Sequence, residues 1–281
     1  MTADASVPPT FDIELQGLLE AIYVQYHSDF RQYAASSLRR RLGQALVGLG
    51  FDTLSALQGK VLRDPLLFQR LLRYLTVGVT EMYRDPDFFR ALRSDVVPIL
   101  RTYPSIRVWI AGCSTGEEVY ALAILLHEEG LLPRAIVYAS DINPHSLQAA
   151  RDGIYPLDRI PQFSESYRAA GGRASLADYY TAGYGAAVFD KALMRNVVFA
   201  DHSLATDEVF AEMHLISCRN VLIYFNRVLQ DRAIGLFARS LCSRGFLGLG
   251  AKETLRFSEH APAFESFAPA AHVYRRVREV A

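Results

Sequence analysis

Residues 108–120, VWIAGCSTGEEVY, limit the possible folds more than any other stretch of this chain. They open with an apolar run typical of a buried strand, pass through small residues, and enter a helical pattern at Glu117. Ser114 or Thr115 can cap the first free amides of that helix. A strand, a short glycine-containing turn and a helix form the first half of a nucleotide-binding βαβ unit. An ordinary strand–turn–helix with solvated glutamates remains an alternative, because short glycine turns are weak signals.

The second half of the unit follows directly. Residues 136–140, IVYAS, are predicted to form the next strand, with Asp141 at its carboxyl end, where a carboxylate can accept hydrogen bonds from ribose hydroxyls. Glu117 and Glu118 occupy the first helical turn, where they would repel a pyrophosphate. The G-x-x-x-G spacing also differs from the G-x-G-x-x-G of dinucleotide sites. These features favour S-adenosylmethionine, which has no phosphate and carries a sulfonium and an ammonium, over NAD.

Composition narrows the class of protein. The chain has 281 residues, of which 51% are hydrophobic, enough for two modest domains with substantial cores. Thirty basic residues balance thirty acidic ones, so the chain lacks the basic excess usual for nucleic-acid enzymes. The Asp/Asn-Pro-Pro-Tyr motif of adenine-directed DNA methyltransferases is also absent. The cysteines form no C-x-x-C pair and the histidines show no ligand spacing, which predicts no metal site.

The sequence also bears on the compartment. No uninterrupted apolar run approaches the ~20 residues of a membrane span. The first ten residues, MTADASVPPT, lack the charged and apolar regions of a signal peptide. Together with three widely spaced cysteines, these features predict a cytoplasmic protein that does not insert into the membrane.

The pattern of apolar residues divides the chain. Helical spacing dominates the first 75 residues, which predicts an all-helical N-terminal domain over 1–75. An α/β domain is predicted over 76–281, and a stretch rich in Tyr, Gly and Ala over about 157–195 interrupts it as an inserted lobe. Further helices are expected from residue 11, from about residue 29, and over 87–100, 146–151 and 228–242, and further strands over 196–200, 214–217, 247–250 and 272–277.

Five sequence blocks occur in the order found in one known family. The chain resembles the CheR-type chemotaxis receptor methyltransferases, which methylate glutamate side chains with S-adenosylmethionine, along nearly its whole length. The blocks are TEMYRD at 80–85, CSTGEE at 113–118, ASDI at 139–142, GIY at 153–155 and CRNVLIYF at 218–225. Any one block alone would be a weak signal, but five in the same order are specific.

The resemblance implies a fold and a cofactor site. The fold is an all-helical N-terminal domain followed by a Rossmann-like class I methyltransferase domain with a small inserted lobe. The cofactor is S-adenosylmethionine, with S-adenosylhomocysteine as product. The family usually has Asn where Gly78 and Ser203 stand here, so backbone or water contacts would replace two side-chain amides. The implied cofactor-binding residues are Gly78, Thr80, Arg84, Glu118, Asp141, Ser203, Leu204, Cys218, Arg219 and Asn220.

The chemistry of carboxylate methylation needs positioning more than acid–base catalysis. A glutamate with a pKa near 4.3 is already ionised at neutral pH, so it needs only correct placement against the methyl donor. A guanidinium can bond a carboxylate and a phenol can donate a hydrogen bond, and the resemblance implies catalytic roles for Arg84 and Tyr224. On the residues alone Tyr224 also fits a core aromatic. Cys113 as a covalent nucleophile is disfavoured, because no histidine lies near it in sequence.

A run of arginines lies on the polar side of the second predicted helix. Arg39, Arg40 and Arg41 fit either a solvated face or a docking surface for an acidic partner. The resemblance favours docking to the acidic methylation region in the cytoplasmic domain of methyl-accepting chemotaxis receptors. The implied function is formation of glutamate methyl esters for sensory adaptation. The alternative is a catalytically weak or inactive cofactor-binding module with a regulatory or docking role, which Gly78 and Ser203 keep open.

Overall fold

The chain forms two compact units. The computed structural model describes residues 9–78 and 80–277, so residues 1–8 of the predicted helical domain lie outside the described residues. The first unit comprises the chain up to Val77 together with Tyr224–Leu229. The second comprises Gly78–Ile223 and the chain from Gln230 onward. A short segment that the sequence places in the α/β domain therefore belongs to the helical unit.

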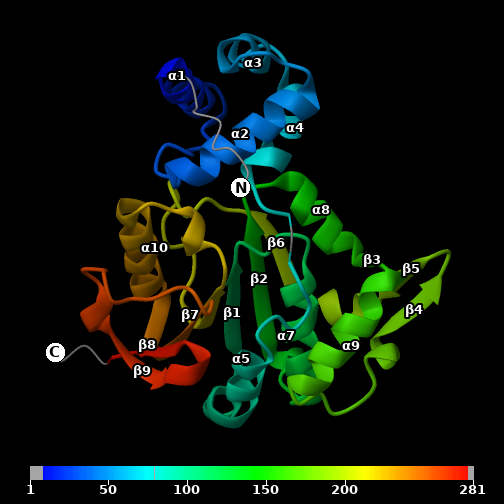
Figure 1. The fold of residues 1–281 in the computed structure, drawn as a ribbon. Coiled ribbons are helices and arrows are strands. Elements are labelled where there is room, and N and C mark those ends of the chain that lie inside the picture. The colour runs from blue at the N-terminus through cyan, green and yellow to red at the C-terminus, as the bar shows by residue number, and fades with distance from the viewer. Residues whose placement is uncertain (1–8, 79, 278–281) are drawn as a thin grey trace, which may run out of the picture. The chain divides into compact units, whose positions relative to one another are not determined.

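The first unit is helical, as predicted. Its helices are α1 (Pro9–Tyr26), α2 (Ala35–Leu49), α3 (Leu54–Val61) and α4 (Pro65–Leu75) (Figure 1). Capping groups set the ends: the Asp64 carboxylate accepts hydrogen bonds from the first free amides of α4, and Gly50 ends α2 in the left-handed region with a φ of 77°. Leu18, Leu42 and Leu71, from three of these helices, are fully buried and form part of the core.

The second helix starts later than its apolar pattern suggests. Residues from about 29 were expected to be helical, but α2 begins at Ala35. Instead, Tyr33 forms an isolated antiparallel bridge with Phe225, and the two rings meet edge to face with centroids 5.0 Å apart. The Asn226 amide also donates to the carbonyl of Gln32. A pairing between segments nearly 200 residues apart thus replaces the first turn of the expected helix.

The second unit is built on a seven-stranded sheet, with the strand order β6-β2-β1-β7-β8-β10-β9. From β6 to β8 neighbouring strands pair parallel, and β10 runs antiparallel to both β8 and β9. Strands β2 and β6 lie on one side of β1 and strands β7 and β8 on the other, so the strand order reverses between β1 and β7, where ligands bind in open α/β sheets. The strands are β1 (Ile106–Ala111), β2 (Ala135–Asp141), β6 (Val197–Asp201), β7 (Met213–Cys218), β8 (Leu241–Leu249), β9 (Phe264–Ala268) and β10 (Val273–Arg276).

Helices cover this sheet. Helix α7 is almost wholly buried, and every residue of its apolar run from Val119 to Leu126 is buried from solvent. Helix α5 continues through a π-helical turn into α6 and carries the chain into β1. The described helices of this region are α5 (Pro86–Ala91), α6 (Val97–Leu100), α7 (Glu117–Glu128), α8 (Pro144–Asp152), α9 (Ile160–Ala169) and α10 (Arg227–Ser240).

The predicted inserted lobe contributes two strands to a small second sheet. Strands β3 (Ile154–Pro156), β5 (Ala186–Phe189) and β4 (Tyr180–Gly183) pair antiparallel in that order, and β3 precedes the predicted start of the lobe at about residue 157. The hairpin of β4 and β5 projects away from the large sheet, beyond helix α9 (Figure 1). The fold class expected from the sequence, a helical domain followed by a Rossmann-like domain, is confirmed.

One local expectation was wrong, and two elements had not been predicted. Helix α7 is preceded by Gly116 as its N-cap without a side-chain cap, so neither Ser114 nor Thr115 caps it as expected. The apolar run after Asn220 forms a 3-10 turn over Leu222–Tyr224, and strand β9 was not predicted. Among the described residues, no helix has the length and hydrophobicity to cross a bilayer.

Candidate cofactor and active site

The turn after β1 brings backbone close to other segments and requires glycine. Gly112 and Gly116 have φ values of 74° and 92°, in the left-handed region. A Cβ at Gly112 would lie 2.5 Å from the Val221 side chain, and one at Gly116 would lie 2.7 Å from Ala150. The small residues of the sequence motif thus form a tight turn at the carboxyl edge of the sheet.

Asp141 ends β2 at the same edge. Its Oδ2 accepts from the Ser114 amide at 2.9 Å, and its Oδ1 accepts from the Asn143 amide at 2.9 Å. Burial raises the pKa of Asp141, while these backbone amides oppose that rise. Each carboxylate oxygen has a second lone pair, so the side chain is fixed and can still accept from a sugar hydroxyl.

The two acids that begin α7 are both engaged by the protein. Glu117 is buried, and its carboxylate accepts from Arg159 at 2.7 Å and from the Thr115 hydroxyl at 2.7 Å. Glu118 accepts from the Ser217 hydroxyl at 2.5 Å and from Arg219 at 2.9 Å. Two carboxylates at the positive end of a helix disfavour a pyrophosphate there.

Arg219 joins three segments at this edge. Its guanidinium pairs with Glu118 and with Asp85, each at 2.9 Å, and donates to the Arg84 carbonyl at 2.5 Å. It also stacks over the Phe88 ring at 4.2 Å, and only 1% of its side chain is exposed. Its two terminal nitrogens thus bond the protein, while its buried Nε has no partner among the described residues, and Arg219 fastens the segment that carries Arg84 to the sheet.

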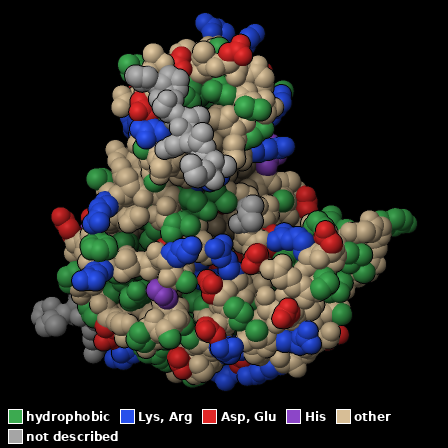
Figure 2. All heavy atoms as spheres, viewed as in Figure 1, with side chains coloured by type: hydrophobic (Ala, Val, Ile, Leu, Met, Phe, Trp, Pro, Cys, Tyr) green, Lys and Arg blue, Asp and Glu red, His purple; other side chains and the backbone are tan. Residues whose placement is uncertain are grey.

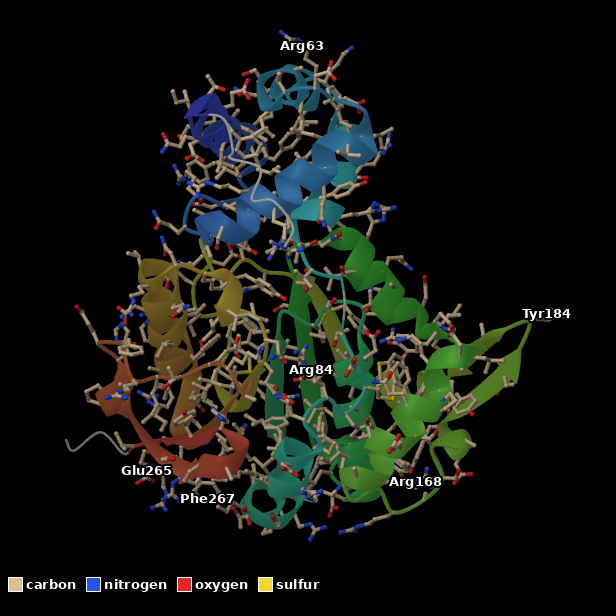
Figure 3. All side chains as sticks on the ribbon, in the orientation of Figure 1. Arg63, Arg84, Arg168, Tyr184, Glu265 and Phe267 are labelled. Carbon is tan, nitrogen blue, oxygen red and sulfur yellow. The ribbon has the colours of Figure 1, made fainter. Side chains whose placement is uncertain are left out.

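Arg84 itself is half-buried and lies over the middle of the second unit (Figure 3). Within residues 9–78 and 80–277, its guanidinium makes no hydrogen bond or ion pair with the protein. The backbone of Arg84 is held by Arg219, whereas its side chain is available to a ligand. This is the arrangement expected of a group that positions a carboxylate.

Thr80 and Gly78 precede Arg84. The Thr80 carbonyl accepts a hydrogen bond from Arg159, which also pairs with Glu117, so one arginine ties the linker to the start of α7. Gly78 is exposed, and a Cβ built on it meets nothing within 4 Å. Packing therefore does not require glycine at position 78.

The remaining implied contacts follow β6 and β7. The Ser203 amide donates to Asp207 at 2.9 Å within a turn, and Leu204 is buried. Cys218 is fully buried at the end of β7, and burial raises the pKa of its thiol well above the usual value. The thiol is thus neutral, and any ligand contact there comes from the backbone. Asn220 follows with a φ of 61°, in the left-handed region.

Tyr224 does not lie where the sequence placed it. It belongs to the first unit, where its carbonyl accepts from the Ala34 amide at 2.8 Å. The Arg41 guanidinium lies over its ring at 4.5 Å. Arg41 is only 4% exposed and donates to the Leu75 carbonyl and to Ser37. The predicted docking surface therefore needs correction at Arg41, which anchors Tyr224 inside the unit.

The other two arginines of the run are exposed. Arg39 pairs with Asp12 through two hydrogen bonds of 2.7 and 2.8 Å, and Arg40 faces solvent. On the visible face of the second unit, basic and acidic side chains are interspersed rather than gathered by sign (Figure 2). That face shows no continuous basic surface of the kind that nucleic acid requires.

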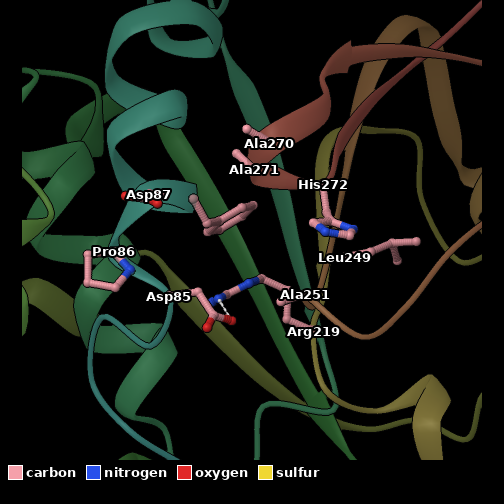
Figure 4. A pocket seen from close by; sticks show the side chains of 10 residues that line it. Asp85, Pro86, Asp87, Arg219, Leu249, Ala251, Ala270, Ala271 and His272 are labelled. Carbon is pink, nitrogen blue, oxygen red and sulfur yellow. Dashed lines mark hydrogen bonds and ion pairs between the residues drawn. The ribbon is translucent and has the colours of Figure 1, made fainter.

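A pocket of about 300 Å³ opens beside the Arg219–Asp85 ion pair (Figure 4). It lies at the carboxyl end of β8, with Phe88 and Leu249 as apolar walls and His272 at one side. Asp85 lines this pocket and its side chain is 39% exposed, so its ion pair with Arg219 is partly hydrated.

The residues present fit S-adenosylmethionine. Asp141 offers fixed acceptor oxygens for ribose hydroxyls, and Glu118 offers negative charge for a cationic ligand.

Sequence reasoning missed the residues that hold these groups in place. Contacts between segments distant in sequence involve Asp85, Arg159 and Ser217, and no local spacing reveals such contacts. Among the described residues, no group of three His, Cys, Asp or Glu is placed to hold a metal.

This fold and this edge define an S-adenosylmethionine-binding methyltransferase domain preceded by a helical domain. Two family descriptions match the chain: "CheR methyltransferase, SAM binding domain" over residues 78–270 and "CheR methyltransferase, all-alpha domain" over residues 13–76. The chain belongs to the CheR methyltransferase family. Its cofactor is S-adenosylmethionine, which confirms the prediction from the sequence.

The chain is similar to the following named proteins and to one solved structure among others. Cher3 of Pseudomonas putida KT2440, whose name marks its methyltransferase activity as inferred, is 58% identical over 94% of this chain and 97% of its own length. The chemotaxis protein methyltransferase of Salmonella typhimurium LT2 is 29% identical over 86% of this chain and 84% of its own. The structure of the N-methyltransferase NodS from Bradyrhizobium japonicum WM9 with S-adenosylhomocysteine matches 68% of this chain and 88% of that chain, with a TM-score of 0.37 and 12% identity.

The role of Asp141 is testable by binding alone. We expect Asp141→Ala to weaken S-adenosylhomocysteine binding at least tenfold, about 1.4 kcal/mol, because the fixed ribose acceptor is lost. Isothermal titration calorimetry measures this, with Asp158→Ala, at an exposed acid outside the large sheet, as the control. Unchanged affinity in Asp141→Ala, or tight binding of NAD by the wild-type protein, would contradict the assignment.

Proposed function

We propose that this chain transfers a methyl group from S-adenosylmethionine to glutamate side chains in the cytoplasmic domain of chemotaxis receptors. Family membership supports methyl transfer, and relatives named chemotaxis protein methyltransferase support the chemotactic setting. The observation that carries the proposal is the half-buried Arg84 guanidinium, which is uncommitted among the described residues while its backbone is fastened by Arg219. The chain works in the cytoplasm, where those receptor domains lie.

The protein's part in this reaction is positioning. When bound, S-adenosylmethionine supplies an electrophilic methyl group, and an ionised glutamate is already a competent nucleophile at neutral pH. Arg84 bonds the substrate carboxylate and orients it, leaving one oxygen free to react. Glu118 and Asp141 hold the cofactor, and Thr80, Gly78, Ser203, Leu204, Cys218 and Asn220 complete its surroundings.

Tyr224 is the second group proposed to act in the chemical step. Its phenol donates a hydrogen bond to the substrate, and its support comes from the family resemblance together with its fixed ring. The ring is held by the buried guanidinium of Arg41 and its backbone by Ala34. A donor whose ring and backbone are both fixed loses little freedom when it binds the substrate.

The exposed arginines Arg39 and Arg40 are proposed to attract the acidic receptor surface. We expect Arg39→Ala/Arg40→Ala to lower kcat/KM for receptor methylation roughly three- to tenfold at low salt, because such charges act on the association rate. The effect should fade at high salt, where the charges are screened. Steady-state methylation at two salt concentrations measures this, with Arg63→Ala/Arg70→Ala as the matched control. An equal loss of kcat/KM in both double variants would mean that Arg39 and Arg40 form only a solvated face and not a docking surface.

Transfer itself is tested by incubating the purified protein with methyl-labelled S-adenosylmethionine and a receptor cytoplasmic fragment. The proposal expects label in the receptor fragment that depends on both protein and cofactor. The rival function, a cofactor-binding module without catalysis, predicts binding of S-adenosylhomocysteine without transfer. Calorimetry on the same preparation separates the two, since an unfolded sample would neither bind nor transfer.

A further inference from the structure

Glu253 is a buried acid, and each of its two carboxylate oxygens accepts hydrogen bonds from two backbone amides. It is only 4% exposed and lies just beyond the carboxyl end of β8. Its Oε2 accepts from the amides of Gly250 at 2.6 Å and Asn220 at 3.0 Å. Its Oε1 accepts from the amides of Val221 at 2.8 Å and Ile223 at 3.4 Å. Burial raises the pKa of Glu253, and the surrounding backbone amides oppose that rise by stabilising the anion.

The segment that these bonds hold has an unusual backbone conformation and is closely packed. Asn220 has a φ of 61°, in the left-handed region, which Asn tolerates better than most residues with a side chain. Gly250 approaches the same segment so closely that a Cβ would lie 2.8 Å from the Asn220 amide nitrogen and 2.9 Å from the Glu253 carboxylate. Glu253 and Gly250 together therefore fix the path of residues 220–223.

Residues 220–223 connect the groups that the site uses. They directly follow Cys218 and Arg219 at the end of β7, and they directly precede Tyr224. Val221 also closes over the turn after β1, since its side chain is the atom group nearest to a Cβ built on Gly112. A shift in this segment would move backbone at the carboxyl edge of the sheet, where the cofactor is expected to bind. It would also move Ile223, the residue before Tyr224.

We infer that Glu253 is a positioning residue that holds the Asn220–Ile223 backbone in the shape required for cofactor binding and methyl transfer. This inference rests on the proposed function for its catalytic part, but its cofactor-binding part stands on S-adenosylmethionine alone. Glu253 touches neither the cofactor nor the substrate in this account. It acts through four backbone amides, of which the Gly250 amide is bonded in a buried position and the other three in part-buried ones.

Neither an amide nor a shorter carboxylate can replace the Glu253 carboxylate as acceptor for all four amides. Glutamine has the same shape but only one acceptor oxygen, so its NH₂ group would face two amide donors in Glu253→Gln. Aspartate keeps both oxygens on a shorter stem, so Glu253→Asp retains acceptors for part of the set. A structural role alone would rank these variants by stability, whereas a positioning role also ranks them by affinity for the cofactor.

The test compares Glu253→Gln with Glu129→Gln, a matched variant at another buried acid. Glu129 pairs with Arg93 and Arg101 at the far end of α7, so its loss destabilises the same unit away from the carboxyl edge. Calorimetry with S-adenosylhomocysteine and thermal melts are run on both. We expect Glu253→Gln to raise Kd at least tenfold, Glu253→Asp to raise it less, and Glu129→Gln to lower the melting temperature with Kd within twofold of wild type.

Gly250→Ala supplies an independent variant should Glu253→Gln fail to fold. It keeps the carboxylate but pushes on Asn220, so the same rise in Kd is expected. Wild-type affinity in Glu253→Gln or in Gly250→Ala, or an equal rise in Glu129→Gln, would overturn the inference. These binding results do not require receptor methylation, so failure of the proposed function and failure of this inference remain distinguishable.

Discussion

Replacing Arg84 with alanine is expected to lower kcat/KM for receptor methylation by roughly a hundredfold or more, about 2.7 kcal/mol or more of transition-state stabilisation. The Arg84 guanidinium is the group that we assign to orient the substrate carboxylate, and its backbone is already fixed by Arg219. Loss of the side chain should therefore remove orientation without moving the segment. Cofactor affinity should fall less than turnover does. Steady-state methylation paired with calorimetry separates the two effects.

A control and a conservative variant sharpen this result. Arg168→Ala removes an exposed arginine of α9 and should leave kcat/KM unchanged (Figure 3). Arg84→Lys keeps the charge but loses the planar fork, so it should recover only part of the activity. If Arg84→Ala turned over like wild type, the positioning role would be wrong. Full recovery in Arg84→Lys would show that charge alone is needed.

Replacing Arg219 with methionine is expected to cause the largest loss of stability at this edge. The variant leaves Glu118, whose side chain is 14% exposed, without its ion-pair partner. Removing one partner of a buried pair costs about 3 to 5 kcal/mol, and we expect about 2 to 4 because Asp85 is partly hydrated by the neighbouring pocket. For a unit of this size that corresponds to a drop in melting temperature of roughly 4 to 16 °C.

The comparison for Arg219 is a surface pair in the same unit. Arg239 pairs with Glu208 at 3.2 Å, and their side chains are 51% and 67% exposed. Arg239→Met should leave the melting temperature close to that of the wild type, because solvent screens this exposed pair. Thermal melts of both variants measure the difference, and calorimetry should show weaker cofactor binding only in Arg219→Met. Equal small shifts in the two variants would mean that Arg219 does not fasten this edge.

The central part of the fold could be predicted from the sequence for a physical reason. A strand buried on both faces must be continuously apolar, and the turn that follows β1 admits only glycine at two positions. These local constraints placed β1, α7 and Asp141 correctly. They also argued against a phosphate site, since Glu117 and Glu118 are adjacent at the start of α7.

Other features depend on contacts that no local pattern records. Tyr224 belongs to the first unit because Tyr33 and Ala34 pair with a segment nearly 200 residues away. Glu253 owes its role to a four-amide set drawn from two loops. Burial of Arg41, in contrast, had a local signal that was overlooked. Arg41 shares the helical face of Leu38, Leu42 and Ala45, all of which are buried.

The nature of the methylated product tests the central claim most directly. A methyl ester of glutamate is cleaved by mild base, whereas a methyl group on nitrogen or sulfur is retained. After labelling of a receptor cytoplasmic fragment by the purified protein, the account predicts that mild base releases the label as methanol and that peptide mass spectrometry places the added methyl group on glutamate. Label that resists base, or that maps to another residue type, would contradict the account.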